Sequence, residues 1–435
     1  MKKILALVLA LTMVFVFVAA CDNNNGTSSS PPVSSTPPAN GNETPSSTPP
    51  SASPDGPIDN APTGEIGMYD PNYNYSANKT YKIIYLVSNN TSGLYTESGK
   101  SFAHWASMSN VDYQGLQDFA GDTDAFFSSL PQLARDYDGI IMDADATMYD
   151  RVYEVMEPIG TPWMSFMGAP RDDNGLGALM HPYIGFEQYD VGAKHAEYLY
   201  EKAKVTWPSV PMSDFGFISV DWSVAPPVHA RETGAHDKLM ELDADMATNR
   251  YFVADAGSLG PPTSDNAQQL VSTVLSMNPG IKYWIIFGEI DDLAQGAAAA
   301  IDLAGLTDTT WVTTFGGTAL QQQWDAGRQD AWRSANFLPQ VIFTEPIFFS
   351  LYAFMNGDAT PETIFPEWKN VHEDTKYGSF ATRLLPWYEI LFDNYKHMLK
   401  WSDVYAGSNI FPDYSADGIS RDDFSNTVPI PANYK

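Results

Sequence analysis

Residues 282–315 read KYWIIFGEIDDLAQGAAAAIDLAGLTDTTWVTTF and contain one complete strand–helix–strand unit. The runs 282–287 and 311–315 are short and largely apolar along their whole length, which is typical of strands covered on both faces. Between them, residues 291–304 follow a helical period. This unit predicts an α/β fold that is built on a parallel sheet.

The same alternation of apolar strand, polar turn and helical segment continues on both sides of this unit, in two successive runs. The first run predicts strands at 81–87, 111–119, 139–142 and 162–166. The second predicts strands at 215–220, 250–254, 282–287 and 311–315, and a short one near 332–336. Two runs of similar size predict two lobes with separate sheets rather than one large sheet.

The two lobes are expected at 69–186 and 187–337, with a return segment at about 338–362 that belongs to the first lobe. Residues 363–435 are predicted to form a C-terminal extension that packs on one lobe. An amphipathic helix is predicted in this extension near 385–401, because its aromatic side chains recur at helical spacing.

The N-terminus has the features of a secretory signal. Two lysines are followed by the apolar run 4–18, which is too short for an ordinary membrane-spanning helix. The small residues before Cys21, the only cysteine in the chain, make this end resemble a bacterial lipobox. We therefore expect residues 1–20 to be a lipoprotein signal peptide and Cys21 to be the lipidation site. The protein is then expected on the extracytoplasmic face of the cell membrane.

Residues 21–68 are predicted to be a disordered linker between the lipid anchor and the lobes. The segment is rich in Ser, Pro, Thr and Asn and has few large apolar side chains. Such a composition cannot bury enough surface to offset the entropy of ordering the chain. Its prolines favour extended conformations, so the segment is suited to holding a folded body away from a membrane.

The formal net charge is −29. A body this acidic repels the phosphates of nucleic acids, so nucleic-acid binding is not expected. The chain also lacks the G-x-S-x-G, H-E-x-x-H, P-loop and strand-linked G-x-G-x-x-G motifs of common enzyme classes. Asp143 and Asp145, at the end of a predicted strand, are a possible carboxylate pair for glycoside hydrolysis, but no partner residues accompany them. We predict a binding protein without enzymatic activity, cofactor or metal.

A series of motifs occurs in a fixed order over roughly residues 80–358. In this order and spacing they resemble the type I periplasmic binding proteins, in particular the ribose- and galactose-binding receptors of ABC importers. The motifs are DGIIM at 138–142, GTPW at 160–163, YDVGA at 189–193, HARETG at 229–234, NPGI at 278–281, DDLAQGA at 291–297 and AG at 304–305.

The resemblance implies two Rossmann-like lobes joined by a hinge, which close on a small ligand and present it to a membrane permease. The expected ligand is a sugar, held by polar side chains and stacked on aromatic rings. Two alternatives remain open at this point. The same body can signal to a membrane kinase instead of a permease, or its ligand can be a nucleoside, an autoinducer or a peptide-like molecule.

In the second lobe, Arg231 matches the ligand-binding arginine of the family, although it could instead pair with a neighbouring acid on the surface. Asp221 and Trp222 end a predicted strand and are expected to offer an acid and a stacking ring, although Trp222 could equally be core. Asp291 aligns with the acid of the family's Asn-Asp pair, and Glu289 is expected to substitute for the missing asparagine.

In the first lobe, Asn89, Asn90 and Tyr95 follow the first strand, where the family has polar ligand contacts; simple turn chemistry is the alternative for the asparagines. Asp143 ends another strand, and Arg171 lies just after the position of the family's Asp-Arg pair. Asn336 lies near the last crossing between the lobes, where the resemblance implies an amide contact with the ligand.

The chain departs from the family at three ligand positions, one of which is the turn 165–168 after the fourth strand, where the family's Asp-Arg pair is absent. Ile290 stands where the family has asparagine, and Gly316 stands where it has the acid that binds sugar hydroxyls. The site is therefore not expected to copy a ribose pocket. A roomier or more apolar site is predicted, suited to a glycoside, an oligosaccharide or a non-sugar ligand.

Overall fold

The computed structural model describes residues 64–90, 93–144, 146–166, 182–368, 372–374, 378–420, 423 and 430. All of them belong to the unit Asp59–Lys435. The predicted signal peptide, Cys21 and the linker as far as residue 63 lie outside the described residues. So do Asp145 and Arg171.

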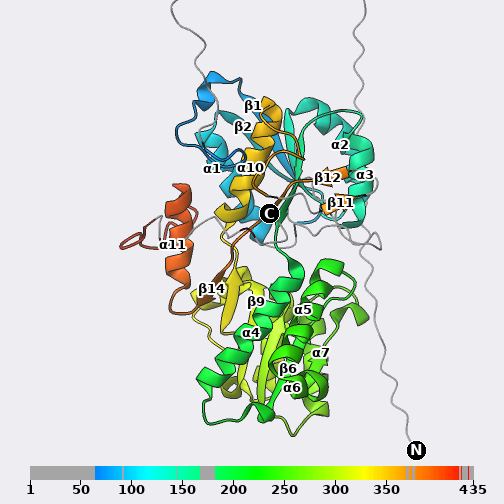
Figure 1. Cartoon of the computed structure of the whole chain (residues 1–435), viewed down its shortest axis with the longest axis vertical. Helices are drawn as coiled ribbons and strands as arrows, with labels where there is room; N and C mark the ends of the chain where they lie inside the picture. Colours follow the sequence, from blue (N-terminus) through cyan, green and yellow to red (C-terminus); the bar gives the residue numbers. More distant parts are fainter. Residues whose placement is uncertain are drawn as a thin grey trace, which may run out of the picture. The chain divides into compact units, whose positions relative to one another are not determined.

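The first lobe contains a parallel sheet with the strand order β2-β1-β3-β4 (Figure 1). Its strands are β1 (Tyr81–Val87), β2 (Val111–Asp118), β3 (Gly139–Asp143) and β4 (Trp163–Ser165). Its helices are α1 (Gly93–Met108), α2 (Thr123–Asp136), α3 (Tyr149–Met156) and the later α10 (Gln340–Asn356), together with the 3-10 turns η1 (Tyr75–Ala77) and η2 (Ala146–Met148). Helix α10 returns from the second lobe and packs against α1 and β3.

The second lobe contains a six-stranded sheet with the order β14-β10-β9-β8-β6-β7. Its strands are β6 (Phe215–Val220), β7 (Tyr251–Val253), β8 (Tyr283–Gly288), β9 (Thr310–Gly316), β10 (Ser334–Phe337) and β14 (Tyr388–Leu391). Its helices are α4 (Gln188–Thr206), α5 (Pro226–Leu242), α6 (Ala244–Asn249), α7 (Ser264–Met277), α8 (Asp291–Leu303) and α9 (Thr318–Asp325), with η3 (Met212–Asp214), η4 (Ala256–Ser258) and η5 (Thr307–Thr309).

Two further strand pairs and one helix lie beyond these two cores in the described part of the chain, in addition to the edge strand β14. β5 (Tyr183–Gly185) pairs in parallel with β13 (Thr382–Leu384), and β11 (His372–Asp374) pairs with β12 (Gly378–Phe380). β14 adds an antiparallel edge to β10. Helix α11 (Tyr395–Ala406) follows it.

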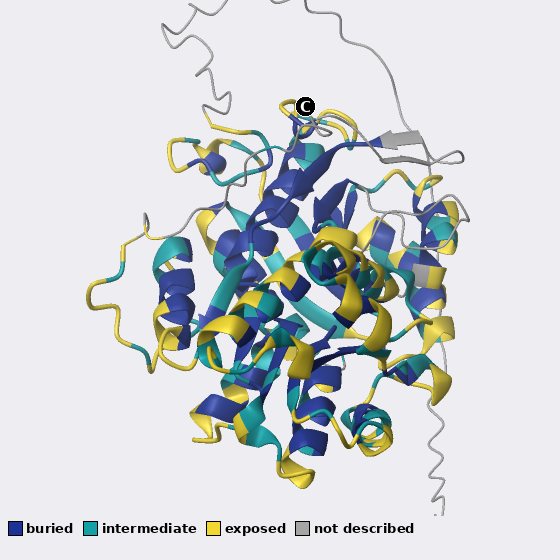
Figure 2. Cartoon of the chain, turned by 60° about the horizontal axis from the view of Figure 1, so that its bottom comes forward, coloured by how far each residue is buried: buried dark blue, intermediate teal, exposed yellow. Residues whose placement is uncertain are grey.

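Burial explains why the apolar runs form strands. Every residue of β6 is buried, and β1 and β8 are buried at all but one position each. In Figure 2 many of the strands are dark blue, whereas the outer faces of the helices are yellow. Side chains on both faces of β1, β6 and β8 are therefore removed from water, as their apolar runs predict, whereas β2 is half-buried to exposed.

Two glycines bring α4 and α5 into backbone contact. A Cβ at Gly192 would lie 1.7 Å from the carbonyl oxygen of Arg231, and a Cβ at Gly234 would lie 2.0 Å from that of Tyr189. Both glycines belong to motifs that carry the family resemblance. Their physical role is close helix packing, which fixes Arg231 relative to the start of α4.

The α/β fold with parallel sheets in two lobes is confirmed. One predicted element is wrong: residues 388–391 form strand β14, so the predicted helix near 385–401 begins only at Tyr395. The reason is that β14 completes the hydrogen bonding of β10, a partner far away in sequence. The predicted linker end at 68 also falls inside the folded body, because Gly67 is buried against Phe365 and Ile364.

No helix in the part of the chain that the structure describes combines the length and apolarity needed to cross a membrane.

Candidate ligand-binding site

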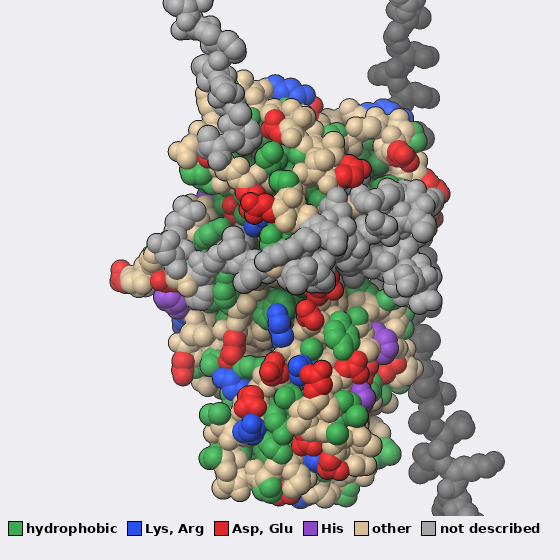
Figure 3. Space-filling view, viewed as in Figure 1, with side chains coloured by type: hydrophobic (Ala, Val, Ile, Leu, Met, Phe, Trp, Pro, Cys, Tyr) green, Lys and Arg blue, Asp and Glu red, His purple; other side chains and the backbone are tan. Residues whose placement is uncertain are grey.

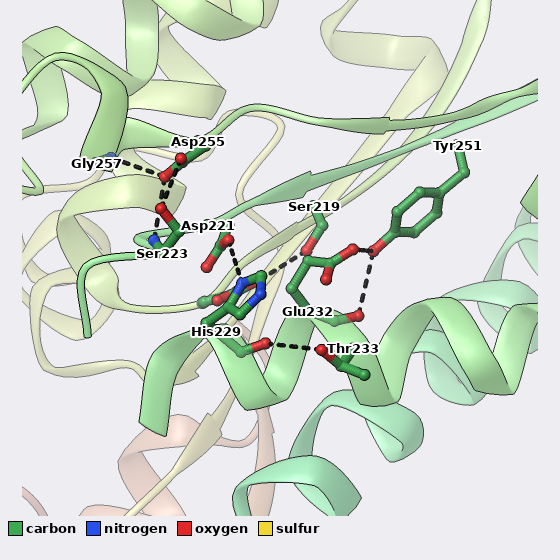
Figure 4. A network of polar contacts seen from close by, with 10 residues as sticks. Ser219, Asp221, Ser223, His229, Glu232, Thr233, Tyr251, Asp255 and Gly257 are labelled. Atoms are coloured by element: carbon green, nitrogen blue, oxygen red, sulfur yellow. Dashed lines mark hydrogen bonds and ion pairs between the residues drawn. The ribbon is translucent and has the colours of Figure 1, made fainter. Parts of the chain in front are cut away.

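Acidic side chains follow three neighbouring strands of the second sheet. Asp221 follows β6, Asp255 follows β7 and Glu289 follows β8. Because the carboxyl ends of parallel strands meet at one edge of a sheet, these residues share that edge, where ligands of open α/β sheets bind. Figure 4 shows Asp221 and Asp255 in this region with their polar partners.

Asp221 is paired with His229 from the first turn of α5. The Oδ2 atom of Asp221 lies 2.7 Å from Nδ1 of His229, and Figure 4 shows the two side chains directed at each other. Asp221 is 1% exposed, whereas nearly half of the His229 side chain is accessible. The buried carboxylate therefore fixes the orientation of the half-exposed imidazole ring.

Glu289 is fully buried beside Asp221. Its Oε1 accepts a hydrogen bond from Ser219 Oγ at 2.8 Å. Burial, followed by the charge of Asp221, raises the pKa of Glu289 well above its usual value. Among the described residues, Oδ1 of Asp221 and Oε2 of Glu289 receive no hydrogen bond from a donor group. A proton held on Glu289 supplies a donor to this carboxyl pair.

Arg231 is held in one orientation beneath the same edge of the sheet. Its Nε donates to Gln188 Oε1 at 2.8 Å, and its Nη1 donates to the backbone carbonyl of Glu289. The guanidinium stacks on Phe315, 4.6 Å from the ring centroid. Burial lowers the pKa of Arg231 to about 10, so the side chain is still charged at neutral pH. It is a buried, preorganised cation rather than a surface arginine paired with Glu232 or Asp237.

Asp291 is committed to a contact within the protein. Its two carboxylate oxygens accept hydrogen bonds from the backbone N–H groups of Gly317 at 2.6 Å and Ala319 at 2.8 Å. N–H groups at the N-terminus of a helix have no acceptor within the helix itself, so Asp291 caps α9 by accepting from two of them. Burial raises the pKa of Asp291 to about 6 against the lowering effect of these hydrogen bonds.

The same contact explains why glycine occupies position 316. Gly316 has a φ of +138°, and a Cβ there would lie 2.7 Å from Oδ1 of Asp291. The acid of the family is therefore absent at a position where the local backbone leaves no room for a side chain.

In the first lobe, the structure brings Tyr95 and Asp143 together. The Asp143 charge, burial and a hydrogen bond between the two side chains raise the pKa of Tyr95 well above its usual value. The backbone N–H of Asn90 donates to Asp118 at 3.1 Å. Asn89 is exposed next to Gly121. These residues follow β1 and β3, so they share the carboxyl edge of the first sheet.

The two remaining predicted residues in the described part of the chain are Trp222, which directly follows Asp221, and Asn336 on β10. Trp222 is half-buried and packs against the core, and Asn336 is half-buried in β10 between Phe315 and Glu389. Within the described part of the chain, Nε1 of Trp222 and Oδ1 of Asn336 are buried without a hydrogen-bond partner.

A cavity of about 350 Å³ lies between the two lobes at the start of α1. Gly93 lines it from the first lobe, and polar residues of α8, α9 and the turn after α9 line it from the second. The polar side chains are Asp291, Asp292, Gln295, Thr318, Gln322, Gln323 and Arg328.

His229 and Gln188 were not predicted as site residues. Their signal in the sequence is positional: His229 lies in the first turn of the helix that follows Asp221, and Gln188 is the first residue of α4. A residue in the first turn after a strand faces that strand's carboxyl end, so both could have been found this way.

The described residues contain no group of three or more His, Cys, Asp or Glu side chains that could hold a metal ion. Figure 3 shows acidic side chains spread over the face in view, with basic side chains standing between them.

No family model and no curated protein sequence matches the chain, but solved structures do. A sugar-binding protein of a sugar ABC transporter from Bacillus halodurans superposes with a TM-score of 0.54 at 15% identity, covering 72% of this chain and 98% of its own. A solute-binding protein from Actinobacillus succinogenes with bound D-allose gives 0.54 at 15% identity, covering 73% and 100%.

The arabinose-binding protein AraP from Geobacillus stearothermophilus gives a TM-score of 0.54 at 14% identity, covering 73% of this chain and 99% of its own. At such low identity the likeness concerns the fold. It extends over almost the whole length of each neighbour.

Proposed function

We propose that this chain, which has the type I periplasmic-binding-protein fold, is a solute receptor. It takes a sugar or sugar-like ligand between its two lobes and delivers it to the permease of an ABC importer. One observation carries the proposal: each lobe places hydrogen-bonding side chains at the carboxyl edge of its parallel sheet. Tyr95 and Asp143 do so in the first lobe, and Asp221, His229 and Arg231 in the second.

The chemistry of these groups suits a polyhydroxylated ligand. Each sugar hydroxyl both donates and accepts a hydrogen bond, so a sugar site needs acceptors and donors side by side. Asp143 and Asp221 are acceptors, Arg231 is a charged donor, and Nε2 of the half-exposed His229 ring has no hydrogen-bond partner among the described residues. A ligand that contacts both clusters favours the closed arrangement of the lobes, because only that arrangement satisfies both sets of contacts.

In the second lobe, two positions that lack the family's polar side chain and a third whose acid is used within the protein shape the choice of ligand. Ile290 and Gly316 supply no polar side chain, and Asp291 is used to cap α9. The second lobe therefore binds through Asp221, His229 and Arg231 instead. A ligand panel has to include furanoses, pyranoses, cyclitols and short oligosaccharides for this reason.

The first experiment is thermal unfolding of the full chain with this saccharide panel, including D-allose, L-arabinose and myo-inositol, and with a matched panel of nucleosides. A ligand that binds only the native state raises Tm by an amount that grows with its concentration. We expect at least one saccharide to raise Tm and no nucleoside to do so. A shift with nucleosides and none with any saccharide would overturn the sugar assignment.

The second experiment separates transport from sensing. Cells that lack the gene for this chain are given the radiolabelled saccharide found in the first experiment. We expect uptake to fall and to return when the gene is restored. Normal uptake, together with loss of a transcriptional response to the saccharide, would assign the chain to a signalling kinase.

A further inference from the structure

The C-terminal segment 388–414, which we call the strap, contacts both lobes. It begins as β14, whose residues Tyr388–Leu391 pair with Phe337–Ser334 of β10 in the second lobe. It continues as α11 and ends in a turn that brings Tyr414 back toward Tyr395, with ring centroids 6.4 Å apart. Figure 1 shows α11 beside the two sheets, separate from the helices that cover them.

Both ends of the strap are fixed to the second lobe by several independent contacts. The hydroxyls of Tyr395 and Tyr414 both donate to Asp325 at the end of α9, at 2.8 and 2.9 Å. The ring of Tyr395 packs on Trp324, with centroids 5.0 Å apart. Glu389 accepts a hydrogen bond from Tyr198 of α4 at 2.7 Å. Together with the β14–β10 ladder, these contacts make the strap part of the second lobe.

The C-terminal end of α11 contacts the first lobe. The Tyr405 hydroxyl donates to Oε2 of Glu345 at 3.0 Å, and His104 Nε2 donates to the backbone carbonyl of Ala406. Glu345 lies on α10 and is 5% exposed, and His104 lies on α1. A hydrogen bond to a buried carboxylate is stronger than one between neutral exposed groups.

We infer that the strap restrains the opening of the lobes: it moves with the second lobe and releases Glu345 and His104 of the first lobe when the lobes separate. The strand ladder and the paired tyrosines hold the strap to the second lobe more firmly than the two hydrogen bonds hold it to the first. The break therefore occurs at Tyr405 and Ala406. This inference concerns the ligand-free chain and does not depend on the ligand that is proposed above.

The test is single-molecule energy transfer on the full chain without ligand. Dyes are attached through non-natural amino acids at Lys100 of α1 and Leu303 of α8, which are both well exposed. Tyr405→Phe removes only the hydroxyl that binds Glu345. We expect it to raise the opening equilibrium constant about tenfold, the effect of losing one hydrogen bond to a carboxylate.

Tyr414→Phe is the matched control, because it removes the same kind of hydrogen bond from the same segment but on the second-lobe side. Tyr395 still binds Asp325 in that variant, so we expect the distribution of the wild-type chain. Equal distributions for Tyr405→Phe and the wild type, or an equal change in both variants, would overturn the inference.

Glu345→Gln provides a second route if Tyr405→Phe does not fold, since it keeps the shape of the acceptor and removes its charge. It is expected to shift the distribution in the same direction, and an unshifted distribution counts against the strap. Because all these readings are made without ligand, they stand apart from the saccharide panel: either experiment can fail while the other succeeds.

Discussion

At the scale of single residues, the cation and the acid that we propose as ligand contacts of the second lobe were each predicted from a different kind of signal. Arg231 was predicted from a family motif, and Asp221 from its place at the end of a strand. The structure shows that His229 holds Asp221, and that Gln188 and the backbone carbonyl of Glu289 hold Arg231. Gln188 and Glu289 come from other elements than Arg231, and His229, although it begins the same motif, shows its pairing with Asp221 only in the fold.

Arg231→Ala is expected to weaken saccharide binding at least tenfold, because it removes a charged donor that is already fixed in place. Isothermal titration with the saccharide that raises the Tm of the wild type measures this. Arg250→Ala is the control: Arg250 binds the carbonyls of Met212 and Phe215 at the opposite end of β6 and should leave affinity unchanged. Unchanged affinity in Arg231→Ala would remove this residue from the site.

Glu289→Gln tests the protonated carboxyl. A carboxyl with a raised pKa holds its proton in the folded state at pH values where the unfolded chain has lost it. Its contribution to stability is complete below the unfolded pKa and is lost as the pH rises through the folded pKa. The glutamine variant does not titrate, so its unfolding free energy relative to wild type should rise by up to about 1.4 kcal/mol per pH unit above pH 4.5.

Urea unfolding of Glu289→Gln and of the wild type at several pH values between 4.5 and 8 measures this difference. Glu241→Gln is the control, since the Glu241 side chain is mostly exposed and pairs only locally with Lys238. A difference between Glu289→Gln and wild type that does not vary with pH would mean that Glu289 is ionised in the fold.

At the scale of elements, the strands that consist of continuous apolar runs were predicted from the sequence. The strands that form only by pairing with a segment far away in the sequence were not. β6 and β8 are buried over nearly their whole length, and this is visible in the amino-acid sequence. β5 and β13 have three residues each and exist because they pair with each other across about 200 residues of chain. The pattern of neighbouring residues contains no information about such a distant partner. For the same reason the spacing of the aromatic residues predicts a helix where β14 forms.

The turn between β9 and α9 gives a testable example of an element that is fixed by one contact. Gly316→Ala places a Cβ 2.7 Å from Asp291 Oδ1 in a backbone conformation that favours glycine, and it disturbs the cap of α9. We expect a loss of about 2–3 kcal/mol in unfolding free energy, measured by urea denaturation at neutral pH.

Gly327→Ala is the control for Gly316→Ala. Gly327 also has a positive φ, but a Cβ there would meet nothing within 4 Å. It should cost only the backbone strain, about 1 kcal/mol. Equal losses in the two variants would show that the contact with Asp291 does not constrain the turn.

At the scale of the whole molecule, the two lobes and the first two connections between them were predicted from the sequence, but the third connection was not. Three segments join the lobes' elements: the step from β5 to α4, the step from β10 to α10, and the step from β13 to β14. The third comes from the extension, which the sequence suggested only as packing on one lobe. Its contacts with both lobes depend on single hydroxyls such as Tyr405, which composition does not distinguish.

Cys21→Ser tests the proposed anchor. Without a thiol at this position no lipid can be attached, so the chain should move from the membrane fraction to the soluble extracytoplasmic fraction. Immunoblots of fractionated cells measure this, with Ser28→Ala in the same segment as the control that stays on the membrane. A serine variant that remains in the membrane fraction would contradict anchoring through Cys21.

The pairing of β14 with β10 has a consequence for how the chain behaves in concentrated solution. The unpaired N–H and C=O groups along the edge of a sheet can recruit a strand from another molecule and start aggregation. Here the chain's own late segment covers β10, so that side of the second sheet is shielded once synthesis reaches Leu391. Until then the nascent protein exposes the edge of β10 to other chains, and the late arrival of β14 closes it.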